Sequence, residues 1–306
     1  MFQMWPNQAH AASGDSTAST AAVDPSGAEG GGGVSEPGTI PDGATPGSIA
    51  QAADKTELAA EYYRVKFRGK SDTSRLNALT KNYRAKYGAD ALPNSNPMAT
   101  LARTTSGTTR IAASAFVSYS LPLYQVPQEK GYYCGPGSGY AILEYLLRNP
   151  YTGPKPSAYN GAALSQSALA TTAHMSTELH QATTWSSDGF RIGLNRWTSG
   201  ATSTGYYADS SSPSSSVFTS DMTYDIDHGH PLGADTVESA NGAHYNGHPT
   251  DKTIGHWLAA YGYTSSGAST KWSDPSTSVW SSAAPYFTAT NSYFVTTFLQ
   301  NNGITW

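Results

Sequence analysis

The only cysteine of the chain stands where a helix is expected to begin. Cys134 is followed by Gly135 and Pro136, and apolar residues then recur at helical spacing (Ile142, Leu143, Leu146 and Leu147). Proline in a first turn, with apolar residues three or four positions apart after it, predicts an amphipathic helix. A helix N-terminus favours a thiolate over a thiol, because its backbone N–H groups and its dipole attract negative charge. A lone cysteine is by default a small buried apolar residue, so this position alone leaves both interpretations open.

A histidine and a carboxylate follow in a predicted β-hairpin. His256 precedes the apolar and aromatic run from Trp257 to Tyr263, a Ser/Thr/Gly turn comes next, and Asp274 stands just after a second short strand. This pattern predicts two paired strands with the histidine on the first. A cysteine on a helix, a distant histidine on a strand and a carboxylate behind it supply the nucleophile, base and orienting group of nucleophilic catalysis. The sequence therefore predicts a reactive cysteine.

The order of the motifs is similar to that of a known family. VPQ at Gln128, CGP at Cys134, GHW and GY around His256, and DP at Asp274 resemble the papain-fold cysteine peptidases of the bacteriocin-processing, double-glycine type. The resemblance is closer to their secreted, transporter-free relatives, the C-thirty-nine-like group, and it covers roughly residues 115–306. It implies that Gln128 lines the oxyanion hole, Cys134 is the nucleophile, His256 the base and Asp274 the orienting acid, with no cofactor.

One residue departs from the family pattern. Gly137 stands where the family commonly has alanine after CGP. Glycine inside a helix costs up to about 1 kcal/mol relative to alanine. We therefore expect a looser first helical turn at this point but no loss of a catalytic group.

The resemblance and the patterning together predict an α+β chain in three regions. Residues 112–306 are expected to form a papain-like domain, with a helical half at about 130–200 and an antiparallel strand-rich half at about 215–306. Residues 49–111 are expected to form a short basic helical extension, a candidate prosegment. Residues 1–48 are low-complexity and are expected to be a disordered tail.

Two helices are expected in the extension. Asp54 and Glu57 fit a capping box, and Leu58, Tyr62 and Val65 follow at helical spacing. A second helix is expected to carry the apolar and aromatic residues Leu76, Leu79, Tyr83 and Tyr87 and to end at Gly88. Ala9-His10-Ala11 has the form of a signal-peptidase site, so the chain start is either the remnant of a signal peptide or an Ala-rich tail.

Charge separates the extension from the domain that follows it. Between Arg64 and Lys86 there are eight Lys or Arg and one acid, Asp72, whereas residues 111–306 hold seven Lys or Arg against twelve Asp or Glu, a net charge of −5. The basic segment could cover the acidic domain as a lid, bind anionic wall polymers, or be a solvated helix face. A nucleic-acid partner is not expected, because the patch is confined to one segment and no recognition motif accompanies it.

The remaining histidines do not predict a metal site. His228, His230, His244 and His248, with Asp225 and Asp227 nearby, lie in Gly/Asn/Pro-rich stretches without the regular spacing of a zinc site. Four aromatic residues that flank the predicted catalytic residues are expected either to line a substrate groove or to be core (Tyr132, Tyr133, Trp257 and Tyr261). No run of 18 apolar residues is present, so no transmembrane segment is expected.

Three functions remain open at this point. The first is a secreted, monomeric cysteine peptidase that hydrolyses peptide or protein substrates. The second is the same chemistry on cell-wall peptide, as an amidase or endopeptidase, which the low charged fraction of 13% permits. The third is a papain-fold binding module without activity. We expect an extracellular location for all three, either free or associated with the cell wall.

Overall fold

A seven-stranded antiparallel sheet forms the centre of the molecule. The computed structural model describes residue 41 and residues 43–69, 72–92, 117–200 and 205–306. Within these ranges the strand order is β2-β7-β3-β4-β5-β6, and β1 pairs with β4 outside this path. The strands are β1 Tyr119–Ser120, β2 Asp209–Ser211, β3 Leu232–Glu238, β4 Ile254–Thr264, β5 Ser269–Ser273, β6 Tyr286–Thr290 and β7 Gly303–Thr305.

Helices cover both faces of this sheet. The α-helices are α1 Pro46–Phe67, α2 Ser74–Tyr87, α4 Cys134–Leu147, α5 Gln166–Leu169, α6 Thr177–His180, α7 Gly189–Ser199, α8 Ser215–Asp227 and α9 Asn291–Phe298. The 3-10 turns are η1 Ala89–Ala91, η2 Ser265–Gly267 and η3 Pro275–Ser278. The α+β class is thus confirmed, although α8 and α9 lie in the part expected to be rich in strands. No helix of the described ranges is both long and apolar enough to cross a membrane.

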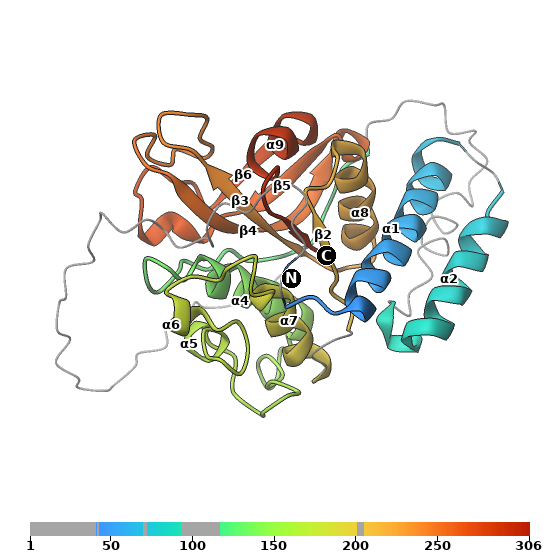
Figure 1. Ribbon diagram of the computed structural model, residues 1–306, viewed down its shortest axis with the longest axis horizontal. Coiled ribbons are helices and arrows are strands. Elements are labelled where there is room, and N and C mark those ends of the chain that lie inside the picture. Colours follow the sequence, from blue (N-terminus) through green and yellow to red (C-terminus); the bar gives the residue numbers. More distant parts are fainter. Residues whose placement is uncertain (1–40, 42, 70–71, 93–116, 201–204) are drawn as a thin grey trace, which may run out of the picture.

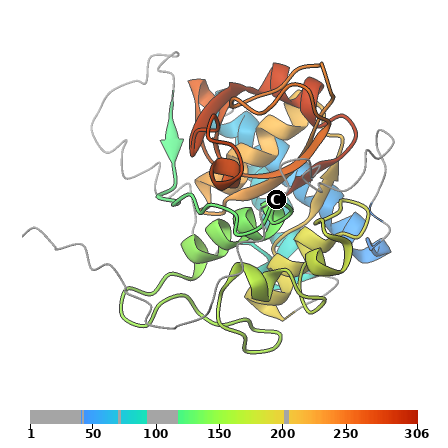
Figure 2. The same ribbon diagram turned by 90° about the vertical axis from the view of Figure 1, so that its left-hand side faces the viewer.

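Strand β4 separates two apolar cores. Successive side chains of a strand point to opposite faces, and those of β4 are buried on both. Leu258 and Ala260 belong to a core shared with α1, α8 and α9. Trp257 and Ala259 belong to a second core shared with α4 and α7. In Figures 1 and 2, α4 to α7 accordingly lie on one side of the sheet as a separate group.

The helix predicted at the cysteine is present and packs on β4. Helix α4 begins at Cys134, and its residues Ile142 and Leu143 are fully buried. One turn after the cysteine, Ser138 Oγ donates a hydrogen bond to the backbone oxygen of Trp257, at 2.9 Å. The start of α4 is therefore fixed to the strand that carries His256.

The first helix of the extension starts earlier than expected. The capping box that begins α1 is formed by Thr45 and Ser48, each of which bonds the backbone N–H of the other. The prediction that Asp54 and Glu57 begin this helix is wrong, and residues 46–48, which were assigned to a disordered tail, are helical. Serine replaces the usual Glu or Gln at the third position of the box, which is why the signal was missed. Residues 1–40 and 42 of the predicted tail lie outside the described residues.

Helix α1 shares a core with the sheet. Leu58 is fully buried, and Tyr62 packs edge-to-face on Tyr224 of α8, with ring centroids 5.4 Å apart. Lys55, also on α1, is fully buried and lies 3.3 Å from the carboxylate of Asp225. Helix α2 ends at Gly88 as predicted, with φ of 101° there. The extension thus packs against α8 at one end of the molecule (Figure 1).

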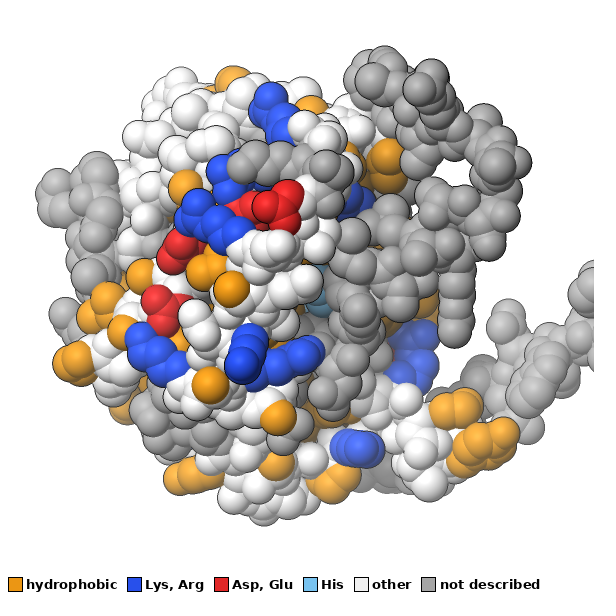
Figure 3. All heavy atoms as spheres, turned by 90° about the vertical axis from the view of Figure 1, so that its right-hand side faces the viewer, with side chains coloured by type: hydrophobic (Ala, Val, Ile, Leu, Met, Phe, Trp, Pro, Cys, Tyr) orange, Lys and Arg blue, Asp and Glu red, His pale blue; other side chains and the backbone are white. Residues whose placement is uncertain are grey.

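Several basic residues of the extension form ion pairs. Lys55 and Lys66 reach across to acids of α8, and Lys66 bonds Asp227. Further pairs lie within the extension, among them Arg75–Glu57 and Lys86–Asp54. Figure 3, which views the molecule from the side of α1 and α2, shows Lys and Arg side chains beside acidic ones. The basic extension therefore contacts acidic residues of the following domain on the α8 side.

Candidate active site

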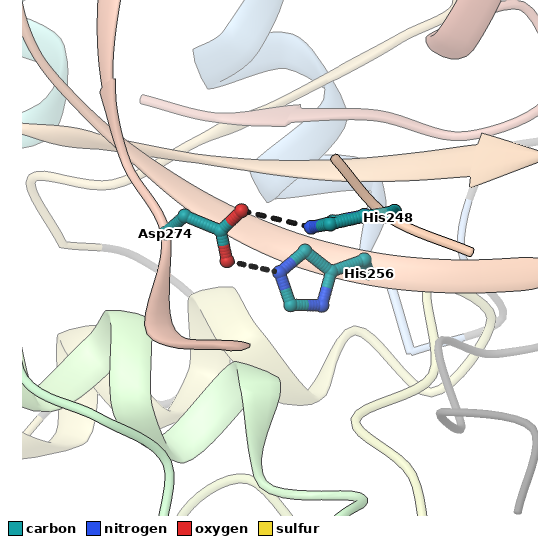
Figure 4. Close-up of side chains that lie close together, drawn as sticks. All are labelled: His248, His256 and Asp274. Carbon is teal, nitrogen blue, oxygen red and sulfur yellow. Dashed lines mark hydrogen bonds and ion pairs between the residues drawn. The ribbon is translucent and has the colours of Figure 1, made fainter. Parts of the chain in front are cut away.

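The hairpin of β4 and β5 brings His256 and Asp274 together. Ala259 pairs with Ser273 in this hairpin, so Asp274, one residue further, comes level with Leu258. Because strand side chains alternate, Leu258 and His256 share a face. The carboxylate therefore meets the imidazole, and His256 Nε2 lies 3.0 Å from Asp274 Oδ1 (Figure 4). Both side chains are fully buried.

Hydrogen-bond donors surround the Asp274 carboxylate. Oδ1 accepts from the backbone N–H and the hydroxyl of Ser276, at 2.8 and 2.6 Å. Oδ2 accepts from Asn246 Nδ2 at 2.6 Å and faces His248 Nε2 at 2.9 Å. Burial by itself raises the pKa of this carboxyl, but the charge of His256 and the bonds from both histidines outweigh burial and hold the pKa well below its usual value. Asp274 is therefore an anion in a fixed orientation.

The first turn of α4 contacts the chain next to Asp274. A methyl group at Gly137 would lie 2.9 Å from the Cβ of Pro275 and 3.5 Å from the Cα of Gln128. Gln128 in turn donates its backbone N–H to the oxygen of Pro275, at 2.9 Å. Cys134 lies at the start of this turn and is buried. The segments that carry Gln128, Cys134, His256 and Asp274 are thus in contact although up to 146 positions separate them.

The departure at Gly137 has a steric explanation. The Cβ of an alanine at this position would lie 2.9 Å from the Cβ of Pro275. Two carbon atoms cannot approach this closely unless one of the two segments moves. Glycine therefore allows helix α4 to lie directly against Pro275, the residue that follows Asp274. The contact between α4 and Pro275 offsets the looser first helical turn that glycine is expected to cause.

Gln128 is buried, and its amide bonds the loop ahead of the cysteine. Nε2 donates to the backbone oxygens of Lys130 and Gly131, at 2.9 and 3.0 Å. These bonds fix the approach of the chain to Cys134. A contribution of this amide to an oxyanion hole would require one N–H to turn from a loop carbonyl to the substrate.

A residue that sequence reasoning left in a loop belongs to the site. His248 lies between β3 and β4, with Nε2 on Asp274 and Nδ1 3.0 Å from Glu238 Oε1. Figure 4 shows His248 and His256 approaching the two oxygens of Asp274 from different segments. The sequence has no signal for this role, because it depends on how the loop folds back onto β5.

Among the described residues, two histidines and one carboxylate lie close enough together to share a metal ion. One ligand atom each of His248, His256 and Asp274 lies within 4.8 Å of the others. Nε2 of His248 and Nε2 of His256 each lie within hydrogen-bond distance of the Asp274 carboxylate. The three side chains therefore form a hydrogen-bonded network. His228 and His230 lie elsewhere, and burial lowers their pKa values to about 4 and about 3, so both are neutral packed residues.

The aromatic residues near the site are mostly core. Trp257 stacks on Phe190 with centroids 4.0 Å apart, and it donates its indole N–H to the oxygen of Thr183. Tyr133 is fully buried and bonds Glu178. Of the two alternatives for these side chains, the core interpretation holds for Trp257 and Tyr133.

No protein-family model matches the chain, and no curated protein sequence is similar to it. The function is therefore argued from the residues and their geometry.

Proposed function

We propose that this protein is a cysteine peptidase with a papain-like arrangement of nucleophile helix and histidine hairpin. The observation that carries the proposal is the buried His256–Asp274 pair on a hairpin against which the helix beginning at Cys134 packs. An ionised carboxylate holds one nitrogen of the histidine, and the chain's only thiol lies at the N-terminus of that helix. These are the parts that an activated nucleophile requires.

In this proposal the two nitrogens of His256 have different tasks. Nε2 bonds Asp274, so Nδ1 is the nitrogen that exchanges a proton with the nucleophile and the leaving group. Figure 4 shows Nδ1 on the side of the ring that faces away from the carboxylate. Asp274 fixes the ring and stabilises the imidazolium form, as the acid of a catalytic triad does.

The reaction is acyl transfer in two steps. The Cys134 thiolate attacks a peptide carbonyl, and the backbone N–H of Cys134, joined by the Gln128 amide, stabilises the oxyanion. His256 gives its proton to the leaving amine, which departs and leaves a thioester. Water then attacks the thioester as His256 takes up its proton, and the acid product leaves with the thiolate restored. Loss of one oxyanion donor typically costs about 3–4 kcal/mol of transition-state stabilisation.

Catalysis accounts for the site better than binding alone. A recognition module has no need for a buried carboxylate that five polar groups surround and that orients a histidine. The amidase or endopeptidase alternative uses the same residues on cell-wall peptide. Both substrates fit a secreted protein that acts outside the cell.

The test compares substrates and one variant. Purified full-length protein and Cys134→Ala are incubated with casein and with purified bacterial cell walls, and released amines and peptides are measured. Release from casein by the wild-type chain alone supports the peptidase, and release from walls alone supports the wall enzyme. Equal release by the Cys134→Ala variant, or none from either substrate, would contradict the proposal. A chelator added to the wild-type reaction should change nothing.

A further inference from the structure

His248 lies between two buried carboxylates. Its Nδ1 is 3.0 Å from Glu238 Oε1 and its Nε2 is 2.9 Å from Asp274 Oδ2, and all three side chains are fully buried. Ser276 Oγ also lies 3.2 Å from Nε2. Glu238 ends strand β3 and Asp274 follows β5, so His248 connects two strands that are not neighbours in the sheet.

This position determines the charge of the ring. A neutral imidazole has one N–H donor and one acceptor nitrogen. Between two carboxylates it would bond one of them and turn a lone pair toward the other. Only the imidazolium donates to both, and although burial alone lowers the pKa of His248, the bonds to Asp274 and Glu238 raise it above the ordinary value.

The loop that carries His248 is built to hold it there. Asn246 and Gly247 both have positive φ, 50° and 74°, and a methyl group on Gly247 would lie 2.6 Å from the oxygen of Ser282. Asn246 Nδ2 bonds Asp274 and also the oxygen of Ala284, at 2.8 Å. This left-handed turn therefore directs the side chains of Asn246 and His248 at the same carboxylate oxygen, Asp274 Oδ2.

We propose that His248 is a positioning residue of the reaction, a buried cation that ties Asp274 to Glu238 and so holds Asp274 Oδ1 on the catalytic histidine. The inference rests on the proposed function and adds a second histidine to it. Deprotonation of His248 would leave one carboxylate facing a lone pair, and Asp274 would turn or take up a proton. Hydrolysis should therefore decline as the pH rises through the pKa of His248.

Other groups around His248 bear on this titration. The His256 ring lies 5.2 Å away between centroids, and its positive charge opposes protonation of His248. The rings of Tyr245 and Trp280 lie at 4.7 and 4.4 Å. On the far side, His244 Nε2 is 3.7 Å from the other oxygen of Glu238.

The first experiment reads the charge of His248 directly. Side-chain nitrogen resonances of ¹⁵N-histidine-labelled full-length protein are recorded from pH 5 to 10, with His248→Gln used to assign the signal. The expected result is two protonated nitrogens on His248 at pH 7, and a lower His248 pKa in Glu238→Gln. A neutral tautomer at pH 7, or an unchanged pKa in Glu238→Gln, would overturn the proposal whether or not the chain is a peptidase.

The second experiment separates positioning from folding. Steady-state hydrolysis is measured against pH for the wild type, His248→Gln and the matched control His244→Gln, which changes a histidine of the same loop that does not touch Asp274. Loss of an outer-shell partner of a metal-ligating histidine typically costs about 10–100-fold in affinity or activity, and His248 holds a comparable place behind Asp274. We expect a decrease of that size in kcat for His248→Gln, with KM unchanged and the decline at high pH removed, and less than a twofold change for His244→Gln.

The outcomes distinguish the two proposals. Equal effects of the His248→Gln and His244→Gln variants on kcat, or a high-pH decline that persists in His248→Gln, would refute the role of His248 and leave the peptidase standing. A wild-type chain without hydrolytic activity would refute the peptidase, and the role of His248 in the reaction would fall with it. The charge of His248 measured by magnetic resonance would still test whether His248 joins Asp274 to Glu238 as a cation.

Discussion

Replacing Lys55 with methionine tests whether the N-terminal helix belongs to the folded core. The ammonium group is fully buried, lies 3.3 Å from Asp225 Oδ1, and donates to the backbone oxygen of Tyr206 at 3.2 Å. It also lies 4.4 Å from the centre of the Trp306 ring. Methionine fills a similar volume but leaves the carboxylate of Asp225 buried without its cation.

The expected loss follows from that buried pair. Removing one partner of a buried ion pair typically costs about 3–5 kcal/mol, which for a domain of this size corresponds to a decrease in Tm of roughly 6–20 °C. Burial raises the pKa of Asp225 to about 6 and Lys55 opposes this rise, so without Lys55 the carboxyl takes up a proton more readily. A carboxyl with a raised folded-state pKa stabilises the fold at low pH and loses that contribution as the pH rises. The decrease in Tm caused by Lys55→Met should therefore be smaller at pH 5 than at pH 8.

Thermal unfolding followed by circular dichroism at both pH values measures this effect. Lys86→Met is the matched control, because Lys86 pairs with Asp54 on the surface, where both side chains are largely exposed, and such pairs contribute little. A decrease of less than 2 °C for Lys55→Met at pH 8, or the same decrease for both variants, would refute the claim that α1 is part of the core.

Three further predictions follow from the same contacts. A chain starting at residue 112 should unfold at a lower temperature and lose activity at every salt concentration, because truncation exposes the α8 residues that the extension buries. Higher activity after truncation would show that the extension is an inhibitory prosegment. Asp274→Asn should keep more activity than Asp274→Ala, since an amide oxygen still accepts a bond from His256, and equal rates would mean that Asp274 does not orient the ring. Gly137→Ala should lower kcat and the Tm, because its methyl group would meet Pro275 at 2.9 Å; unchanged values would show that the close approach is not required.

Local patterns predicted the parts of the site that local structure builds. The proline after Cys134 and the apolar spacing behind it determine where α4 begins, and the aromatic run after His256 with a turn behind it determines the hairpin. Both depend on neighbours within a few residues, and both are present as expected.

Long-range contacts could not be predicted in this way. Nothing in the sequence around Lys55 marks it as buried, because its burial depends on Asp225, 170 positions away. His248 lies in a Gly/Asn/Pro-rich stretch without periodicity, and its role depends on a left-handed turn that folds onto the chain after β5. The start of α1 was missed for a different reason, because serine takes the place of the usual acid in its capping box.

The pH dependence of cysteine alkylation tests the central claim most directly. Cys134 is the only thiol in the chain, so mass spectrometry after a timed exposure to iodoacetamide reports one site and needs no substrate. If His256 and the helix N-terminus hold the sulfur as a thiolate, the native chain should react at nearly the same rate at pH 6 and pH 8, whereas His256→Ala should follow an ordinary thiol pKa of about 8.5. A native rate that falls about tenfold per pH unit below pH 8, in parallel with the rate of His256→Ala, would contradict an activated cysteine.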